Sequence, residues 1–214
     1  MTVLEPKEAY RLLAPDYDSA PNALIALEQR VLEQFLPDLH ERRLVDVGSG
    51  TGRWAKYAVV RGASVVSVDV CYEMLRRAPR PAVLADACRL PLPDACADLV
   101  ICAFTLGYAP CCFAELGRIV RPGGLVFVSD VHPGALRAGW KRSFRTERGV
   151  VEIAHAAYTL EDLTAPELKL TRLLEPSLGL PEKTIFDRAG CPERFEDAAR
   201  GPAVFVAQFI RTSR

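Results

Sequence analysis

The sequence carries no excess of charge of either sign, because 27 lysines and arginines balance 27 aspartates and glutamates. A chain of zero formal charge has no global field to draw it to nucleic acid or to an anionic membrane. Composition therefore argues against a dedicated nucleic-acid-binding protein.

Long hydrophobic runs are missing as well. The longest uncharged apolar stretch, residues 99–114, is interrupted by Gly107 and Pro110 and falls short of the roughly 18 residues that a membrane span needs. The first residues carry Lys7 and Arg11 among acidic side chains and no apolar core, which is not the pattern of a signal peptide. We expect no membrane span and a cytoplasmic location.

Paired metal-binding cysteines are also absent. The seven cysteines are irregularly spaced, form no C-x-x-C pair and have no histidine at zinc-ligand distance. We expect small apolar thiols in a reducing cytoplasm and no metal site.

The chain does contain a steady alternation of short β-branched runs and amphipathic segments. Such alternation is typical of βαβ units, which form a parallel sheet with helices on both faces. Strands are predicted at 42–48, 63–70, 81–86, 97–104 and 124–132, and helices at 21–36, 52–61, 71–78 and 110–120.

The rhythm changes after residue 132. A hairpin is predicted within 142–158, around residues 147–149, and two β-prone runs, 168–176 and 203–211, complete the sheet. We therefore predict an α/β, Rossmann-like, seven-stranded and mostly parallel sheet whose last strand is antiparallel. The predicted single domain divides into a helical cover (1–40), a cofactor-binding core (41–132) and a substrate side with the C-terminal strands (133–214).

The sharpest motif is VDVGSGTG, residues 45–52, which joins a strand to a helix. Glycines let backbone turn tightly and approach a ligand closely, and a helix start favours anionic groups. The spacing G-x-G-x-G differs from the dinucleotide pattern G-x-G-x-x-G, and no Gly-Lys-Ser/Thr ending of a P-loop follows. The loop suits a smaller nucleoside that carries an amino-acid tail, whose ammonium group Asp46 is predicted to hold directly or through water. For the glycines alone, an ordinary βα turn is the alternative.

Two further acids end the next two strands. Asp69 follows Gly52 by seventeen residues and Asp86 follows Asp69 by seventeen, and both lie at the sheet edge where open α/β folds bind ligands. Asp69 is predicted to take the ribose hydroxyls and Asp86 the adenine amino group. For each acid alone, a capping or surface role is the simpler alternative.

With these motifs in place, the sequence resembles the class I S-adenosylmethionine-dependent methyltransferases. It is most similar to the small-molecule branch typified by the ubiquinone and menaquinone biosynthesis methyltransferases. The resemblance covers roughly residues 10–132 and rests on the stretches VDVGSGTGRWA, SVDVCYEML, ADACRLPLPDACADLV, IVRPGGLVFVSD and LAPDYDSAPN. One departure is LTAPELKL (163–170), which is shorter than the helix usual before strand six.

The resemblance implies S-adenosylmethionine as cofactor and assigns its contacts along the chain. The methionine part is expected against the glycine loop, the ribose on Asp69, the adenine against Val70, and the sulfur beside the end of strand four, with Tyr17 covering the site. The implied cofactor residues are Tyr17, Asp46, Gly48, Ser49, Gly50, Gly52, Asp69, Val70, Asp86, Ala87, Ala103 and Phe104.

The acceptor side is less defined. Methyl transfer needs approach geometry and, for some acceptors, a base. His132, at the end of the fifth strand, is the best candidate for a catalytic base, because imidazole side chains as a class titrate near neutral pH; a histidine that only forms hydrogen bonds in the loop is the alternative. His155, Tyr108 and Trp140 are candidate substrate contacts, and packing roles are the alternative for each.

Three functions follow from these patterns. The leading hypothesis is methyl transfer from S-adenosylmethionine to an O, C or N atom of a small molecule. The alternatives are an RNA or protein methyltransferase that docks through the basic segment 137–148, and a cofactor-binding protein without catalysis. The sequence does not specify the acceptor or the oligomeric state.

Overall fold

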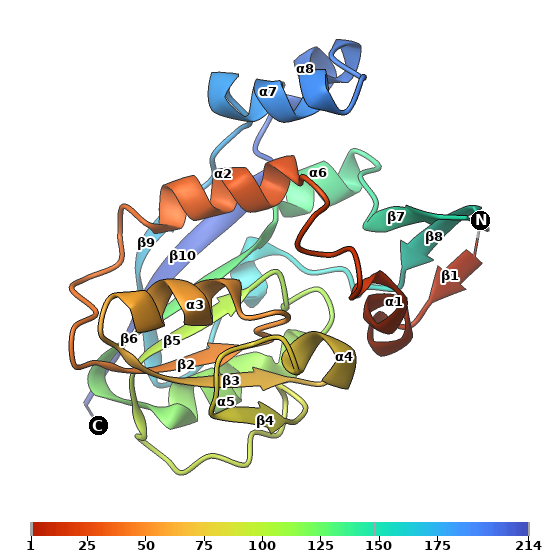
Figure 1. The fold of residues 1–214 in the computed structure, drawn as a ribbon. Helices are drawn as coiled ribbons and strands as arrows, with labels where there is room; N and C mark the ends of the chain where they lie inside the picture. The colour runs from red at the N-terminus through yellow and green to blue at the C-terminus, as the bar shows by residue number, and fades with distance from the viewer. Residues whose placement is uncertain (1, 148, 214) are drawn as a thin grey trace.

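The molecule is built on one seven-stranded sheet with strand order β4-β3-β2-β5-β6-β10-β9 (Figure 1). The computed structural model describes residues 2–147 and 149–213. The strands are β2 (Arg43–Val47), β3 (Ser64–Asp69), β4 (Ala82–Leu84), β5 (Ala97–Ala103), β6 (Val120–Val131), β9 (Leu168–Leu174) and β10 (Val204–Arg211).

Strand directions confirm the predicted fold class. Strands β4, β3, β2, β5 and β6 are mutually parallel, and β10 runs antiparallel to both of its neighbours, β6 and β9. Because the parallel strands are covered on both faces, they are dense in β-branched and apolar residues, as buried strands are.

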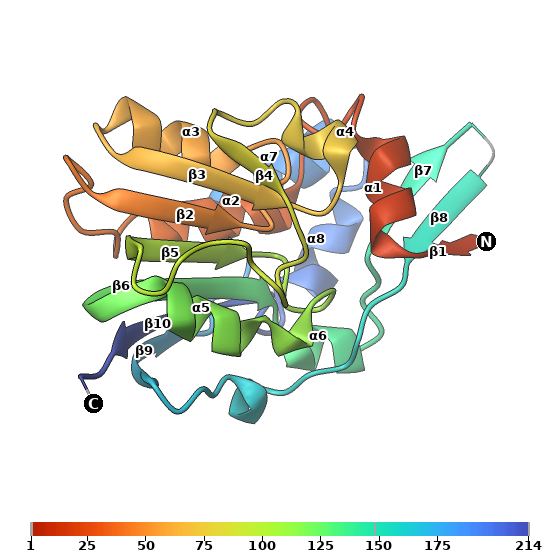
Figure 2. The same cartoon turned by 90° about the horizontal axis from the view of Figure 1, so that it is seen from below.

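Helices cover both faces of the sheet, as Figures 1 and 2 show. On one face, α2 (Ala23–Leu32), α3 (Arg53–Val60) and α8 (Glu193–Ala198) share an apolar cluster with the strands, and α7 (Leu180–Arg188) lies beside α2 and α8. On the other face, α5 (Phe113–Ile119) packs into a second cluster.

Most differences from the predicted elements lie at element ends. The helix expected over 21–36 is α2, which ends at Leu32; Asn22 caps its start by accepting hydrogen bonds from Leu24 N (2.9 Å) and Ile25 N (3.3 Å). The helix expected over 110–120 is a 3₁₀ turn, η1 (Pro110–Cys112), followed by α5. Strand β6 begins at Val120, four residues earlier than predicted.

A second, three-stranded sheet was not predicted in full. The hairpin expected within 142–158 is present as β7 (Ser143–Thr146) and β8 (Gly149–Ile153), and Arg148 lies outside the described residues. The N-terminal strand β1 (Thr2–Leu4) adds to β8 in parallel. Helix α1 (Pro6–Leu13) follows and contacts both β8 and α4 (Tyr72–Leu75) (Figure 2).

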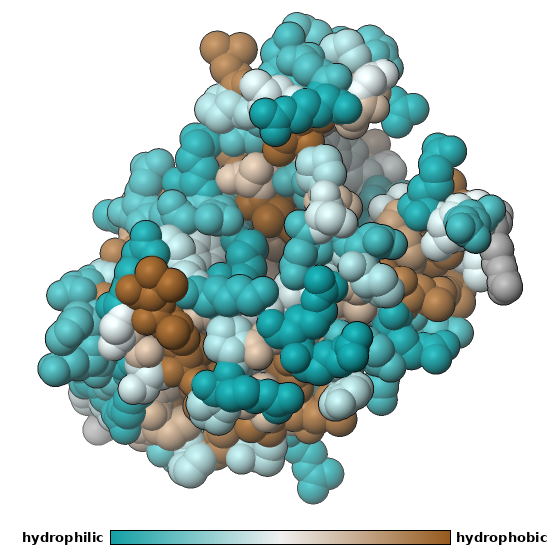
Figure 3. All heavy atoms as spheres, in the orientation of Figure 1, coloured by the Kyte–Doolittle hydropathy of each residue, from teal (hydrophilic) through white to brown (hydrophobic). Residues whose placement is uncertain are grey.

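Two short elements complete the part of the chain that follows β6, α6 (Pro133–Arg137) and η2 (Leu160–Asp162). The surface in Figure 3 is mainly hydrophilic on the face shown, with hydrophobic side chains in separate patches. None of the helices in residues 2–147 and 149–213 combines the length and the apolar character needed to cross a membrane.

Candidate active site

The glycine loop lies directly after β2 and has left-handed backbone at each of its glycines. The φ angles are +67° at Gly48, +56° at Gly50 and +83° at Gly52. A Cβ added to Gly48 would lie 1.9 Å from the Thr105 Oγ1 atom. Glycine is required here by both conformation and space, so the loop backbone lies directly against the segment that follows β5.

Asp69, at the end of β3, is linked to this loop. Its Oδ2 accepts a hydrogen bond from Gly50 N (2.7 Å) and its Oδ1 accepts one from Cys71 N (2.8 Å). Burial raises the pKa of this carboxyl, and the backbone donors counteract the shift. Asp69 thus fixes the position of the glycine loop relative to β3 while it also lines a cavity.

The first cavity, of about 280 Å³, opens at the carboxyl ends of the parallel strands. This is the edge where ligands bind in open α/β sheets. It brings together nine of the twelve predicted cofactor residues: Tyr17, Gly48, Gly50, Asp69, Val70, Asp86, Ala87, Ala103 and Phe104.

Asp46 differs from most of the predicted cofactor residues. It is buried and does not line the cavity; its Oδ2 accepts a hydrogen bond from Ala55 N (3.0 Å), in the first turn of α3. Burial raises its pKa to about 7. This bond holds the start of α3, and the predicted contact of Asp46 with an ammonium group, directly or through water, stays a prediction.

Ser49 and Gly52 also stand outside the cavity wall. Gly52 packs against Ala78 and Pro79. The Ser49 Oγ is buried without a hydrogen-bond partner among the described residues, and the same holds for Arg53 Nη1. Buried polar atoms are normally paired, so these two orphaned donors beside the glycine loop fit a polar ligand group.

Arg53 was not predicted as a site residue. Its Nη2 lies 2.7 Å from Glu28 Oε2, and Glu28, fully buried in α2, also accepts hydrogen bonds from Trp54 Nε1 and Ser129 Oγ. This network joins α2, α3 and β6 beneath the loop. The local sequence pattern does not reveal the Arg53–Glu28 ion pair, because its two residues are far apart in the sequence.

The N-terminal segment supplies further walls that the sequence pattern did not reveal. Glu5, Lys7 and Tyr10 line the first cavity, because β1 pairs with β8 and brings α1 over the sheet edge. The Tyr10 and Tyr108 hydroxyls lie 3.1 Å apart. These residues reach the cavity because β1 and β8, which are far apart in the sequence, pair with each other.

A second cavity, of about 160 Å³, adjoins the first. Both are lined by Tyr10, Tyr17, Phe104 and Tyr108, and the predicted contact Trp140 lines the second. Burial raises the pKa of Tyr10 well above its usual value and that of Tyr17 to about 12. These phenols are therefore protonated near neutral pH and act as hydrogen-bond donors rather than bases.

Phe104 lies at the junction of the cavities and has a φ of +53°. Its N–H donates to Ser129 O (2.7 Å). A non-glycine residue in this conformation is strained, and such strain clusters at functional sites. The prediction placed this residue next to the cofactor sulfur.

The two histidines lie outside both cavities. His132 caps α6: Nδ1 accepts a hydrogen bond from Gly134 N (3.0 Å), and Nε2 lies 2.8 Å from Glu175 Oε2. His155 Nδ1 lies 3.2 Å from Ile153 O. Both ring nitrogens of His132 are thus engaged away from the cavities, and its role as a base stays a prediction.

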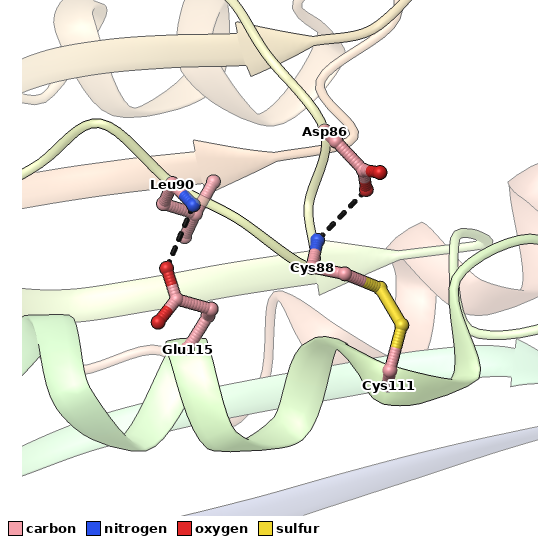
Figure 4. Close-up of a disulfide and its surroundings, with 5 residues drawn as sticks. All are labelled: Asp86, Cys88, Leu90, Cys111 and Glu115. Atoms are coloured by element: carbon pink, nitrogen blue, oxygen red, sulfur yellow. Dashed lines mark hydrogen bonds between the residues drawn. A yellow bond between two sulfur atoms is a disulfide. The ribbon is translucent and has the colours of Figure 1, made fainter.

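The cysteine prediction is wrong for one pair. Cys88 and Cys111 form a disulfide beside the predicted adenine edge, where Asp86 Oδ1 accepts a hydrogen bond from Cys88 N (2.9 Å) (Figure 4). The spacing of 23 residues gave no sign of it, because the contact arises from folding α5 under the sheet. The other five cysteines are free, and no cluster of metal-binding side chains occurs in the described parts of the chain.

Comparison with known proteins finds a family match for the central part of the chain. Residues 45–128 match the methyltransferase domain family. Malonyl-[acyl-carrier protein] O-methyltransferase of Serratia marcescens is 32% identical over 140 residues, 60% of this chain and 53% of that protein. The corresponding protein of Geobacter sulfurreducens is 29% identical over 181 residues, 74% of this chain and 66% of that protein. The chain spans about half the length of most of these curated relatives.

Solved structures share the fold. An S-adenosylmethionine-dependent methyltransferase from Mesorhizobium loti superposes with a TM-score of 0.66 at 23% identity, covering 86% of this chain and 97% of that one. A second, from Listeria monocytogenes, gives 0.69 at 18% identity, covering 88% and 100%. These likenesses show that the chain has the α/β fold of those structures. Residues 45–128 thus match the methyltransferase domain family, and the chain shares the fold of these S-adenosylmethionine-dependent methyltransferases, which is the resemblance that its motifs indicated.

Proposed function

We propose that this chain transfers the methyl group of S-adenosylmethionine to a small-molecule acceptor. The observation that carries the proposal is the pair of adjoining cavities. One is lined by the predicted cofactor residues and the other is apolar and aromatic, and they share Tyr10, Tyr17, Phe104 and Tyr108. A donor in one cavity and an acceptor in the other would meet at this shared wall.

Most of the cofactor residues keep the roles that the resemblance implies. Asp69 would hold the ribose, Asp86 and Ala87 the adenine edge, and Gly48 and Gly50 the methionine part. Ser49 and Gly52 stand outside the wall of the first cavity, and Asp46 supports α3. The cofactor supplies an electrophilic methyl group.

The chain's own contribution is position and the exclusion of water. Tyr10 and Tyr17 come from the N-terminal cover and Tyr108 from the loop after β5, so together they enclose the junction. Fixed orientation of two reactants is worth several orders of magnitude in rate.

An oxygen acceptor that arrives already ionised fits this site best. Among the described residues the shared wall holds no imidazole, and burial raises the pKa of its Tyr10 and Tyr17 phenols. A carboxylate or an acidic hydroxyl needs no base from the protein. The relatives named as malonyl-[acyl-carrier protein] O-methyltransferases support an oxygen acceptor of this kind.

The basic segment 137–148 gives little support to a nucleic-acid acceptor. Lys141 Nζ lies 2.7 Å from Glu152, and Arg142 pairs with Asp130, so these two charges are compensated. We propose a small-molecule acceptor and a cytoplasmic enzyme.

The test is acceptor-dependent formation of S-adenosylhomocysteine. The purified protein is incubated with S-adenosylmethionine and a panel of carboxylates, malonyl thioesters and phenols. We expect product with at least one acceptor, and loss of product in Asp69→Ala but not in Asp197→Ala, an exposed acid outside both cavities. A folded protein that binds the cofactor yet forms no product with any acceptor would instead be the binding protein without catalysis.

A further inference from the structure

The second cavity has a distinct charge character. Most of its wall is apolar or aromatic, with Tyr10, Tyr108 and Trp140 among the rings. Among the described residues that line it, the only ionised side chains are Lys141 and Arg142, and both are cations. A cavity with an apolar body and only positive charge at its wall is complementary to an apolar molecule that bears an anionic group.

Arg142 is the buried one of these two cations. Its side chain is only 8% exposed, its Nη2 pairs with Asp130 Oδ1, and its guanidinium lies 4.7 Å from the centre of the Tyr108 ring. Lys141, by contrast, is half-exposed and paired with Glu152 at the surface. Arg142 is therefore the cation that an occupant of the cavity would meet.

The hydrogen bonds around Arg142 are unequally distributed. Asp130 is well supplied with donors, because its oxygens accept from Gly107 N (2.9 Å), from Val131 N (2.7 Å) and from Arg142. Arg142 Nε is buried and has no partner in the described structure. A buried guanidinium N–H without an acceptor is costly, so one acceptor is missing on the cation side of the pair.

We propose that the second cavity binds the acceptor and that Arg142 receives a carboxylate group on it. The substrate class is a carboxylic acid with an aliphatic or aromatic body. This assignment rests on the proposed function, because it treats the neighbour of the cofactor cavity as the acceptor site. A guanidinium forms paired, directional bonds to a carboxylate, and the surrounding rings accommodate the apolar body.

Acid and amide pairs of the same shape test this assignment. Hydrocinnamate and octanoate, with hydrocinnamamide and octanamide as uncharged counterparts, are titrated calorimetrically in the presence of saturating S-adenosylhomocysteine. We expect each acid to bind at least about tenfold more tightly than its amide, the effect of one charge-assisted hydrogen bond.

Two variants should move acid affinity in opposite directions. Arg142→Lys keeps a positive charge for Asp130, so it should fold, but it removes the Nε donor and should weaken acid binding by about tenfold. Asp130→Asn removes the competing negative charge and should tighten acid binding. Arg30→Gln breaks a similar pair with the buried Glu182 outside both cavities and should leave acid affinity unchanged. A merely structural role for Arg142 would give weaker binding in both cavity variants.

The proposal is overturned if neither acid binds up to its solubility limit, if the acids bind no better than the amides, or if the preference survives in Arg142→Lys. Failure of the proposed function is recognised separately. In that case S-adenosylhomocysteine itself does not bind, and the same acid and amide titrations are then read on the ligand-free protein.

Discussion

The left-handed glycines and buried acids that follow the first strands set the geometry of the site one residue at a time. Gly48 is the most constrained of them, since a methyl group there would overlap the Thr105 side chain. Asp69 and Asp46 then hold the loop and the helix that follow. The site therefore depends on single atoms whose replacement gives distinct, measurable effects.

Gly48→Ala is expected to weaken S-adenosylmethionine binding by about tenfold or more, because overpacking costs about 1–3 kcal/mol. Gly190→Ala is the matched control, since Gly190 has nearly the same φ (+68°) but nothing within 4 Å of an added Cβ. Calorimetry on both variants separates the clash from the backbone cost. Equal affinities in the two variants would contradict a tight loop at Gly48.

Asp46 is expected to make stability depend on pH. Its pKa rises from 3.8 to about 7 on folding, so between these values the native state holds a proton that the unfolded state has released. The contribution of Asp46 to the free energy of unfolding is thus fully present below pH 3.8 and is lost as pH rises through 7.

Asp46→Asn removes this titration while it keeps an oxygen for the Ala55 N–H. Denaturant unfolding at a series of pH values should show the variant gaining stability relative to the parent chain as pH rises through this window. A difference that stays constant with pH would show that Asp46 does not carry the shift.

At the level of whole elements, the site is assembled from segments that are separated in the sequence. The loop after β4 carries Asp86 and Ala87, and the turn before α5 carries Tyr108 and Ala109. The Cys88–Cys111 disulfide joins these two segments (Figure 4). It therefore ties one wall of the first cavity to the wall that it shares with the second.

Cys111→Ser is expected to lower the free energy of unfolding by about 3 kcal/mol under oxidising conditions, the effect of opening a loop of this length. Cys191→Ser, a free cysteine outside the cavities, should leave it unchanged. A strong reductant should bring the parent chain to the stability of Cys111→Ser. If oxidised parent and variant unfold together, the disulfide is not formed in solution.

The elements that the sequence predicts well are those with local signals. One strand pattern and three glycines predict β2, the glycine loop and α3. The positions of Asp69 and Asp86 at the ligand-binding edge follow from the rule that parallel strands end at one edge of the sheet. The N-terminal strand β1 could not be found in this way, because three residues have no periodicity and their pairing with β8 is non-local.

The same limit applies to the orientation of single side chains. His132 and Asp46 have the chemistry of site residues, but their orientation depends on a Gly134 N–H and on the first turn of α3. Arg142 showed only as part of a basic segment, since its partner Asp130 lies on a different strand. Side-chain direction in such cases is decided by tertiary packing.

Over the whole molecule, the cavities lie between two parts of the fold, which we call the floor and the cover. The carboxyl ends of the parallel strands form the floor, and α1 with the β1-β8-β7 sheet forms the cover (Figures 1 and 2). Tyr10 and Tyr17 reach both cavities from the cover. The two cavities therefore adjoin each other beneath one cover.

The central claim is that the first cavity binds S-adenosylmethionine. Its most direct test is calorimetric titration of the folded, ligand-free protein with S-adenosylmethionine, with NAD as control ligand. The account predicts saturable one-to-one binding of S-adenosylmethionine and none of NAD. Absence of S-adenosylmethionine binding, or equal binding of NAD, would contradict it.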